Sequence, residues 1–68
     1  MRAILSTTNP VRLSFIVALL ADAGIETVVL DTHASIVDGS IGAIPRRVMV
    51  DDDAHAQATA ILRGAGEL

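Results

Sequence analysis

The sequence predicts a single domain of the α+β class, with strands and helices in the order strand, helix, strand, strand, helix. The run Ile25 to Asp31 is rich in β-branched residues, as is typical of strands, and the run Ile44 to Val50, with a proline near its start, predicts a further strand. Two other segments, Asn9 to Gly24 and Asp51 to Leu68, repeat apolar residues with the spacing of a helix. The chain has 68 residues, which is enough for one domain over residues 1–68 and no more.

The N-terminal part of the chain predicts a strand followed at once by a helix. Residues Arg2 to Thr7, RAILST, are short, apolar and end in threonine, as strands often do. Asn9 is a good N-cap, and Pro10 suits the first helical position because its missing N–H would have no partner there. Gly24 is placed to end the helix in a left-handed conformation. One face of this helix holds Leu13, Ile16, Leu20 and Ala23, with Val17 and Leu19 beside them.

The apolar arc of this first helix is wider than one sheet can cover. Phe15 and Leu19 lie well away from the line through Leu13 and Ile16, and a helix that faces a single sheet needs a narrower stripe. We therefore expect Phe15 and Leu19, together with Ile4 of the first strand, to form a partner surface. The alternative is that neighbouring loop residues cover this arc.

The second and third strands are separated by a long segment with turn chemistry around Asp38–Gly39 and Gly42. This segment carries Ile36, Val37 and Ile41, so we expect it to pack over an open face of the sheet. In the third strand Pro45 suits the first residue. Strand alternation then puts Arg46 on the face of Val48 and Val50, and Arg47 on the face of Met49.

The last segment predicts an amphipathic helix that begins at three aspartates. We expect one of Asp51–Asp53 to cap the helix and the others to lie in its first turn, where the helix dipole favours negative charge. Either Gly64 or Gly66 ends the helix. Its apolar face is formed by Ala54, Ala58, Ile61, Leu62 and Ala65.

These elements predict a ferredoxin-like unit that lacks its fourth strand. A right-handed crossover makes the first two strands parallel, with the third antiparallel between them. The result is a three-stranded antiparallel sheet of order 1-3-2 with two helices on one face. The missing strand would have paired with the first strand, so that edge is open and invites another chain. We therefore expect a homodimer, formed through this edge strand or through the sheet face without helices.

Composition narrows the classes of function. Apolar residues make up 51% of the chain, a high share for its size, which favours a partner surface. The absence of cysteine excludes disulfides and thiolate metal sites and fits a reducing cytoplasm. The net charge of -3 argues against nucleic-acid binding.

The run Leu13–Ala23 could be the apolar core of a signal peptide, but Pro10 and Ser14 interrupt the pattern. The run is also too short to span a membrane.

Two stretches carry a resemblance to a known family. They are TNPVRLSFIVALLADAGIE, Thr8 to Glu26, and the region from Val29 to Val50 with the motif GSIGAIPRRVMV. With these motifs the chain resembles a family of small prokaryotic signal-transducing proteins, a domain of unknown function. The resemblance implies a bacterial protein with a β-α-β-β-α fold related to ferredoxin-like and PII-type regulatory proteins, and a role in signal transduction.

The best candidate ligand site is the glycine-containing loop with the two arginines. Backbone N–H groups at Gly39, Ser40 and Gly42 could form a nest for an anion, with Arg46 and Arg47 as its cationic partners. The alternative is a turn that leads into a strand. Alternation favours this alternative, because it points the two arginines to opposite faces. The arginine over the helices would then pair with a carboxylate, either Asp31 or one of Asp51–Asp53.

No residue pattern predicts catalysis, a cofactor or a metal. His33 and His55 have no recognised ligand spacing, and no nucleophile motif is present. The sequence therefore predicts a small, non-catalytic binding or regulatory module, a cytoplasmic homodimer that acts through protein contacts or a small anion. The alternatives are an enzyme or metal-dependent site built on the Asp38–Gly42 loop and Asp51–Asp53, or an accessory subunit of a larger complex.

Overall fold

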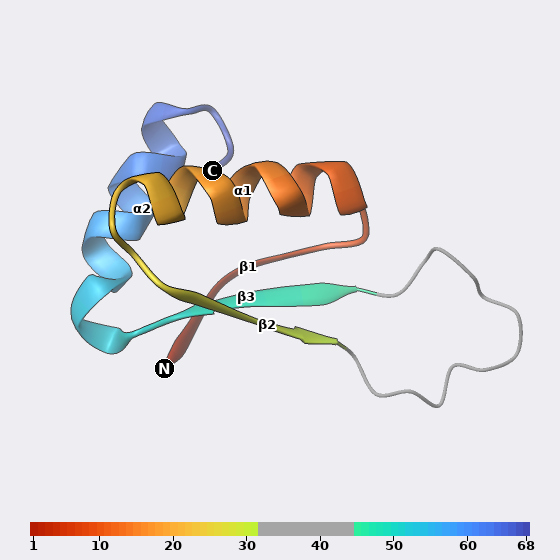
Figure 1. The fold of residues 1–68 in the computed structure, drawn as a ribbon, viewed down its shortest axis with the longest axis horizontal. Helices are drawn as coiled ribbons and strands as arrows, with labels where there is room; N and C mark the ends of the chain where they lie inside the picture. Colours follow the sequence, from red (N-terminus) through yellow and green to blue (C-terminus); the bar gives the residue numbers. More distant parts are fainter. Residues whose placement is uncertain (32–44) are drawn as a thin grey trace, which may run out of the picture.

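The computed structural model describes residues 1–31 and 45–68. Its elements occur in the predicted order β-α-β-β-α, with a short 3₁₀ turn, η1, before the last helix (Figure 1). They are β1 (Arg2–Thr7), α1 (Pro10–Asp22), β2 (Thr27–Asp31), β3 (Arg46–Val50), η1 (Asp52–Ala54) and α2 (His55–Gly64). The segment between β2 and β3, for which the sequence predicts packing over the sheet, lies outside the described residues.

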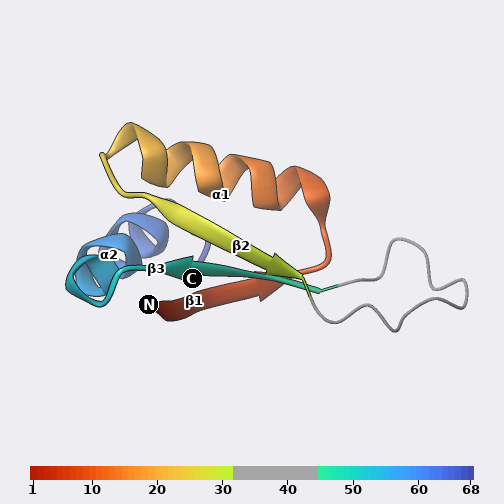
Figure 2. The ribbon, with the colours of Figure 1, turned by 60° about the horizontal axis from the view of Figure 1, so that its bottom comes forward.

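The three strands form a sheet of order β1-β3-β2, with both outer strands antiparallel to β3 (Figure 2). The prediction that the third strand lies in the middle is confirmed. Val48 of β3 pairs with Leu5 on one side and with Val29 on the other. Arg47 pairs with Ser6 and Leu30.

A β-bulge interrupts β1. The register with β3 shifts between Ala3 and Leu5, so Ile4 is an extra residue in the strand. Regular alternation would send the side chains of Ile4 and Leu5 to opposite faces. The bulge changes the direction of the strand, and both side chains pack against the core.

Both helices lie on the same side of the sheet (Figure 1). Val48 and Val50 of β3 face them and are fully buried, whereas Arg47 on the opposite face is exposed. The buried core joins the two layers and consists of Leu13, Ile16, Leu20, Ile25, Val48, Val50, Ala58 and Leu62.

The ends of α1 follow the predicted chemistry. The side-chain oxygen Oδ1 of Asn9 accepts hydrogen bonds from the backbone N–H groups of Val11 (2.9 Å) and Arg12 (3.2 Å). At the other end Gly24 has φ 81°, in the left-handed region. The N–H of Ile25 reaches back to the carbonyl of Leu20 at 2.9 Å, which is the Schellman arrangement. Ile25 thereby becomes a buried helix-end residue, so β2 begins at Thr27 rather than at the predicted Ile25.

The start of α2 differs from the prediction that an aspartate side chain caps it. Neither Asp51, before η1, nor Ala54, before α2, makes a side-chain capping bond. The backbone carbonyl of Asp51 instead accepts from the N–H of Ala54 at 2.9 Å, which closes the 3₁₀ turn. Gly66, with φ 79°, ends the helix region, and Ala65 is exposed rather than part of the apolar face.

Candidate functional site

The two candidate arginines begin the central strand, next to the loop that the sequence singles out. Arg46 is half-buried on the helix side of β3, in register with Thr7 and Asp31. Arg47 is exposed on the other side. Strand alternation thus separates the two side chains, which do not form a single clamp. Gly39, Ser40 and Gly42 lie outside the described residues, so an anion site there stays a prediction.

The strand register also decides which acidic residues are neighbours of Arg46 along the backbone. Asp31 is its neighbour on β2. Asp51 follows the far end of β3, roughly 16 Å from Arg46 at about 3.3 Å per residue. The aspartate triplet is therefore too distant to pair with Arg46. One of its members, Asp52, lies 3.4 Å from the amino group of Met1 instead.

The sheet face without helices carries an apolar surface. Val28 and Leu30 are 41% and 39% exposed, and they flank the half-buried Met49 and the exposed Arg47 of the central strand. Figure 2 shows this face of the sheet toward the viewer, with β3 between its neighbours. We name it the open sheet face and define it by Ala3, Ser6, Val28, Leu30, Arg47 and Met49.

A second apolar surface lies on the outer side of α1. Phe15 is 49% exposed, and Val11, one turn earlier, is 76% exposed. With the exposed Ala18 they form what we name the α1 outer patch. Of the three predicted partner residues, Phe15 belongs to this patch, whereas Leu19 and Ile4 are half-buried and pack against the core. Sequence reasoning missed Val11, although its position four residues before Phe15 places both on one face.

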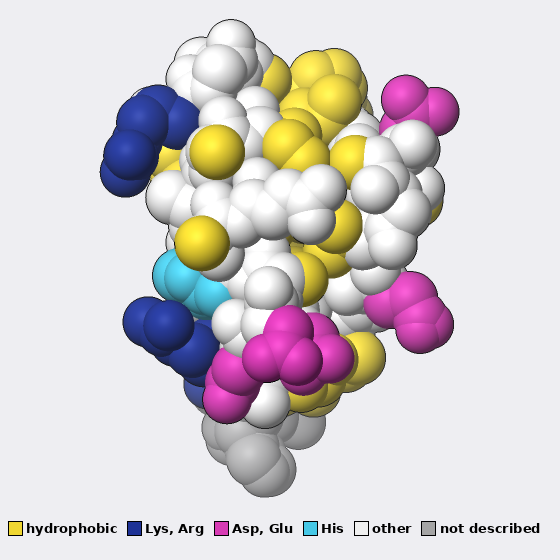
Figure 3. Space-filling view, turned by 90° about the vertical axis from the view of Figure 1, so that its left-hand side faces the viewer, with side chains coloured by type: hydrophobic (Ala, Val, Ile, Leu, Met, Phe, Trp, Pro, Cys, Tyr) yellow, Lys and Arg dark blue, Asp and Glu magenta, His cyan; other side chains and the backbone are white. Residues whose placement is uncertain are grey.

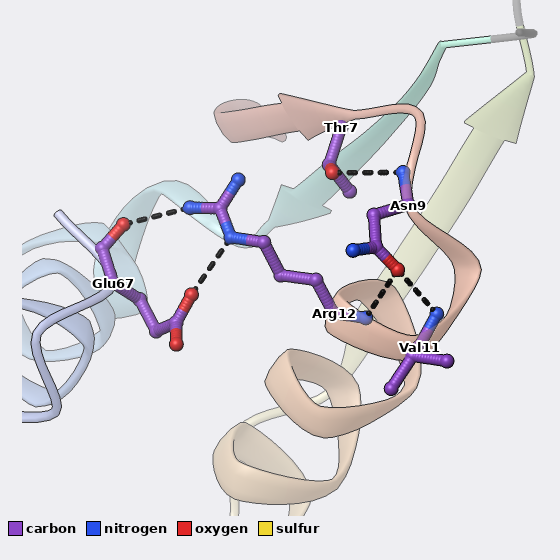
Figure 4. Close-up of polar contacts among 5 residues, drawn as sticks. All are labelled: Thr7, Asn9, Val11, Arg12 and Glu67. Atoms are coloured by element: carbon purple, nitrogen blue, oxygen red, sulfur yellow. Dashed lines mark hydrogen bonds and ion pairs between the residues drawn. The ribbon is translucent and has the colours of Figure 1, made fainter.

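A polar cluster ties the start of α1 to the chain after α2 (Figure 4). Arg12 donates from Nε to Oε1 of Glu67 at 2.7 Å and from a terminal nitrogen to the Glu67 backbone carbonyl at 2.8 Å. Beside it, the hydroxyl of Thr7 accepts from the N–H of Asn9 at 3.1 Å. The guanidinium therefore uses two of its donors inside the protein, and we assign Arg12 a structural role.

Adjoining clefts lie at the end of the molecule where α1 ends and β2 begins. They share Met1, Gly24, Ile25 and Glu26 as lining residues, and their volumes are about 440 and 500 Å³. The larger one reaches Asp51. Figure 3 faces this end of the molecule and shows an apolar strip with acidic side chains to its right and below it, and basic side chains and a histidine on the left of the view. The charge at the clefts is mixed, because Met1 with its N-terminal amino group lines both of them beside Glu26.

The histidines do not form a metal site within the part of the chain that the structure describes. There, no group of three His, Asp or Glu side chains is placed to hold a metal ion. The ring nitrogen Nε2 of His55 lies 3.3 Å from the carbonyl oxygen of Ala3, so this histidine links α2 to β1. His33 lies outside the described residues. No helix in residues 1–31 and 45–68 has the length and apolar character needed to cross a membrane.

The fold and its surfaces define the class: a small α+β domain of the ferredoxin-like type, with helices on one face of a three-stranded sheet. A family model described as "Putative prokaryotic signal transducing protein" matches residues 1–66. The chain belongs to this family, a domain of unknown function, and the resemblance found in the sequence is confirmed. No curated protein matches the chain.

Proposed function

We propose that this protein is a non-catalytic binding module of prokaryotic signal transduction that acts through protein contacts, as a homodimer in the cytoplasm. The description of the family supports the signalling role. The cysteine-free sequence supports a reducing compartment.

The observation that carries the proposal is apolar surface on both layers of the domain. Phe15 and Val11 are exposed on the helix layer, and Val28 and Leu30 are exposed on the sheet layer. Clustered apolar side chains of this size are typical of contact sites, because leaving them in water costs about 25 cal/mol per Å².

The composition of the open sheet face also favours a protein partner. Arg47 projects from the central strand among apolar neighbours, next to Met49 and in register with Leu30. Arginine, methionine and aromatic residues are enriched at the centres of protein interfaces, and arginine is frequent among residues that dominate binding energy. A partner for this face would present apolar side chains around a carboxylate.

A photo-crosslinking experiment tests this function. A photoreactive phenylalanine analogue replaces Phe15 in one variant and Arg63, exposed on α2, in the control. We expect discrete protein adducts from position 15 that an excess of unlabelled protein suppresses, and none from position 63. The captured partner is then purified, and Phe15→Ser and Arg47→Ala are tested separately for binding. At least one should weaken binding roughly ten-fold or more. Identical adducts from both positions, or unchanged affinity in both variants, contradict the proposal.

A further inference from the structure

The edge strand β2 is unusual because it exposes apolar side chains in succession. Val28, Val29 and Leu30 are 41%, 37% and 39% exposed. Alternation sends Val29 to the helix side of the sheet and the other two to the open sheet face. On the helix side the neighbour of Val29, Val48 in β3, is fully buried. Within residues 1–31 and 45–68, β2 pairs with β3 on one side only. Its outer edge therefore combines unpaired backbone groups with apolar side chains on both faces.

The order of residues in β2 suits pairing with itself. If two copies run antiparallel about a two-fold axis at Val29, then Val29 lies opposite its own copy and Val28 lies opposite Leu30. Thr27 then takes the position opposite Asp31. The apolar residues meet one another, and no two like charges lie opposite each other, which is the condition for a favourable cross-strand pair.

The other edge, β1, is less suited to the same pairing. The bulge at Ile4 breaks its regular geometry, and bulges are one way in which proteins protect an exposed edge. The carbonyl of Ala3 is already 3.3 Å from Nε2 of His55. α2 also packs against β1. These contacts leave β2 as the edge with regular, accessible geometry.

We propose that two copies of this protein associate through their β2 strands, antiparallel and centred on Val29, to form one continuous sheet. This places the dimer contact at the edge opposite to the β1 edge expected from the missing fourth strand. It deepens the proposed function by identifying one protein partner as a second copy, and it leaves the α1 outer patch free for another protein. Val28 and Leu30 of each copy would meet across the axis and extend the open sheet face over both copies.

The size of the contact sets the kind of dimer to expect. β2 has five residues, so its pairing alone buries less surface than the roughly 1,200 Å² of a stable interface. We therefore expect a dimer in exchange with the monomer, favoured at high concentration. Sedimentation velocity of the full chain, up to about 1 mM, is the appropriate measurement.

A charge-swap experiment at Val29 tests the register. Val29→Lys and Val29→Glu each set two like charges opposite one another, and we expect each variant alone to dimerise at least roughly ten-fold more weakly than wild type. An equal mixture of the two should regain the dimer, because opposite charges then meet. The control Ser6→Lys, on the exposed side of β1, should leave the dimer unchanged. Far-UV circular dichroism of each variant checks that it folds.

A cysteine variant provides a second, independent measurement. Because the chain contains no cysteine, Val29→Cys introduces a single thiol that would face its own copy. Mild oxidation should give a disulfide-linked dimer from Val29→Cys and not from Ser6→Cys.

Three outcomes would show that the proposal is wrong. The first is that wild type stays monomeric at every concentration up to about 1 mM, and the second is that Ser6→Lys and not Val29→Lys abolishes the dimer. The third is that both the mixture of Val29→Lys with Val29→Glu and the oxidised Val29→Cys remain monomeric. A monomeric wild type would remove the homodimer from the proposed function, whereas the binding role of the α1 outer patch would still be decided by the crosslinking test at Phe15.

Discussion

The two helices lie side by side on one face of the sheet, yet their outer surfaces differ. α2 buries Ala58 and Leu62 and exposes polar residues such as Gln57 and Arg63. α1 also buries its inner residues, but its outer side remains apolar at Val11 and Phe15. The residues of α2 are thus accounted for by folding alone. Folding does not explain the apolar residues on the outer side of α1, and we therefore assign them to binding.

The largest expected effect on stability comes from substitutions on the buried sides of the two helices. There α1 and α2 should respond alike. Ile16→Ala in α1 and Leu62→Ala in α2 each remove a fully buried side chain. Each should lower the free energy of unfolding by about 2–5 kcal/mol, through lost apolar burial and the cavity left behind. Urea denaturation followed by circular dichroism measures the loss. In a domain of this size, a variant that is unfolded before urea is added has lost at least the whole stability of the wild type, which agrees with the prediction. A loss below about 1 kcal/mol in either helix would contradict the shared core.

The second largest effect on stability is expected at the contact between the start of α1 and the chain after α2. Glu67→Ala removes the carboxylate partner of Arg12, whose side chain is 35% exposed against 22% for that of Glu67. The substitution removes the short bond to Oε1, which is partly shielded from solvent, and leaves the bond to the backbone carbonyl, so we expect a loss of about 1 kcal/mol at most. A double-mutant cycle with Arg12→Ala, measured by urea denaturation, isolates the coupling. Arg63→Ala, at an exposed site, is the control. Additive losses from the two single variants would show that the pair contributes nothing.

The helix starts offer a matched pair of substitutions with different outcomes. Asn9→Ala removes two capping bonds to α1 and should cost about 1 kcal/mol of stability. Asp51→Ala removes no side-chain cap, so only a dipole effect of a few tenths of a kcal/mol should be lost. Thermal or urea unfolding of both variants in the same buffer makes the comparison. Equal losses would mean that the two helix starts depend on their preceding residues to the same extent.

A small effect on stability is also expected at the outer side of α1. Phe15→Ser replaces a half-exposed side chain and should change the free energy of unfolding by less than about 1 kcal/mol. Its effect on partner capture should be large, as described above. If Phe15→Ser instead destabilises the domain as much as Ile16→Ala does, the outer patch is part of the core and the difference between the helices disappears.

Much of the fold could be predicted because the signals are local. Asn9, Pro10 and Gly24 fix the ends of α1 through their own backbone and side-chain chemistry. The strand predicted at Ile44–Val50 and the handedness of the crossover together predict the central position of β3. The separation of Arg46 and Arg47 follows from alternation, which holds here because β3 is regular.

The features that could not be predicted depend on distant partners. The bulge at Ile4 accompanies the packing of Ile4 and Leu5 against a core that includes residues of β3 and α2, which lie far along the chain. The contact between Arg12 and Glu67 joins residues that are 55 positions apart. The exposure of β2 depends on how much of the sheet α1 covers. The residues of the strand alone carry no signal of this. The 3₁₀ turn replaced the expected aspartate cap because a backbone carbonyl supplied the acceptor.

The position of β3 between the outer strands has a consequence for biosynthesis. In the described part of the chain, β1 and β2 each pair with β3, and β3 is made last of the three. A nascent chain that ends before Val50 therefore exposes the apolar segments of β1 and β2 and lacks the complete β3 strand with which each of them pairs. The domain must therefore assemble after β3 has been made, in one cooperative event, and a ribosome stalled before Arg46 would leave a product prone to aggregation.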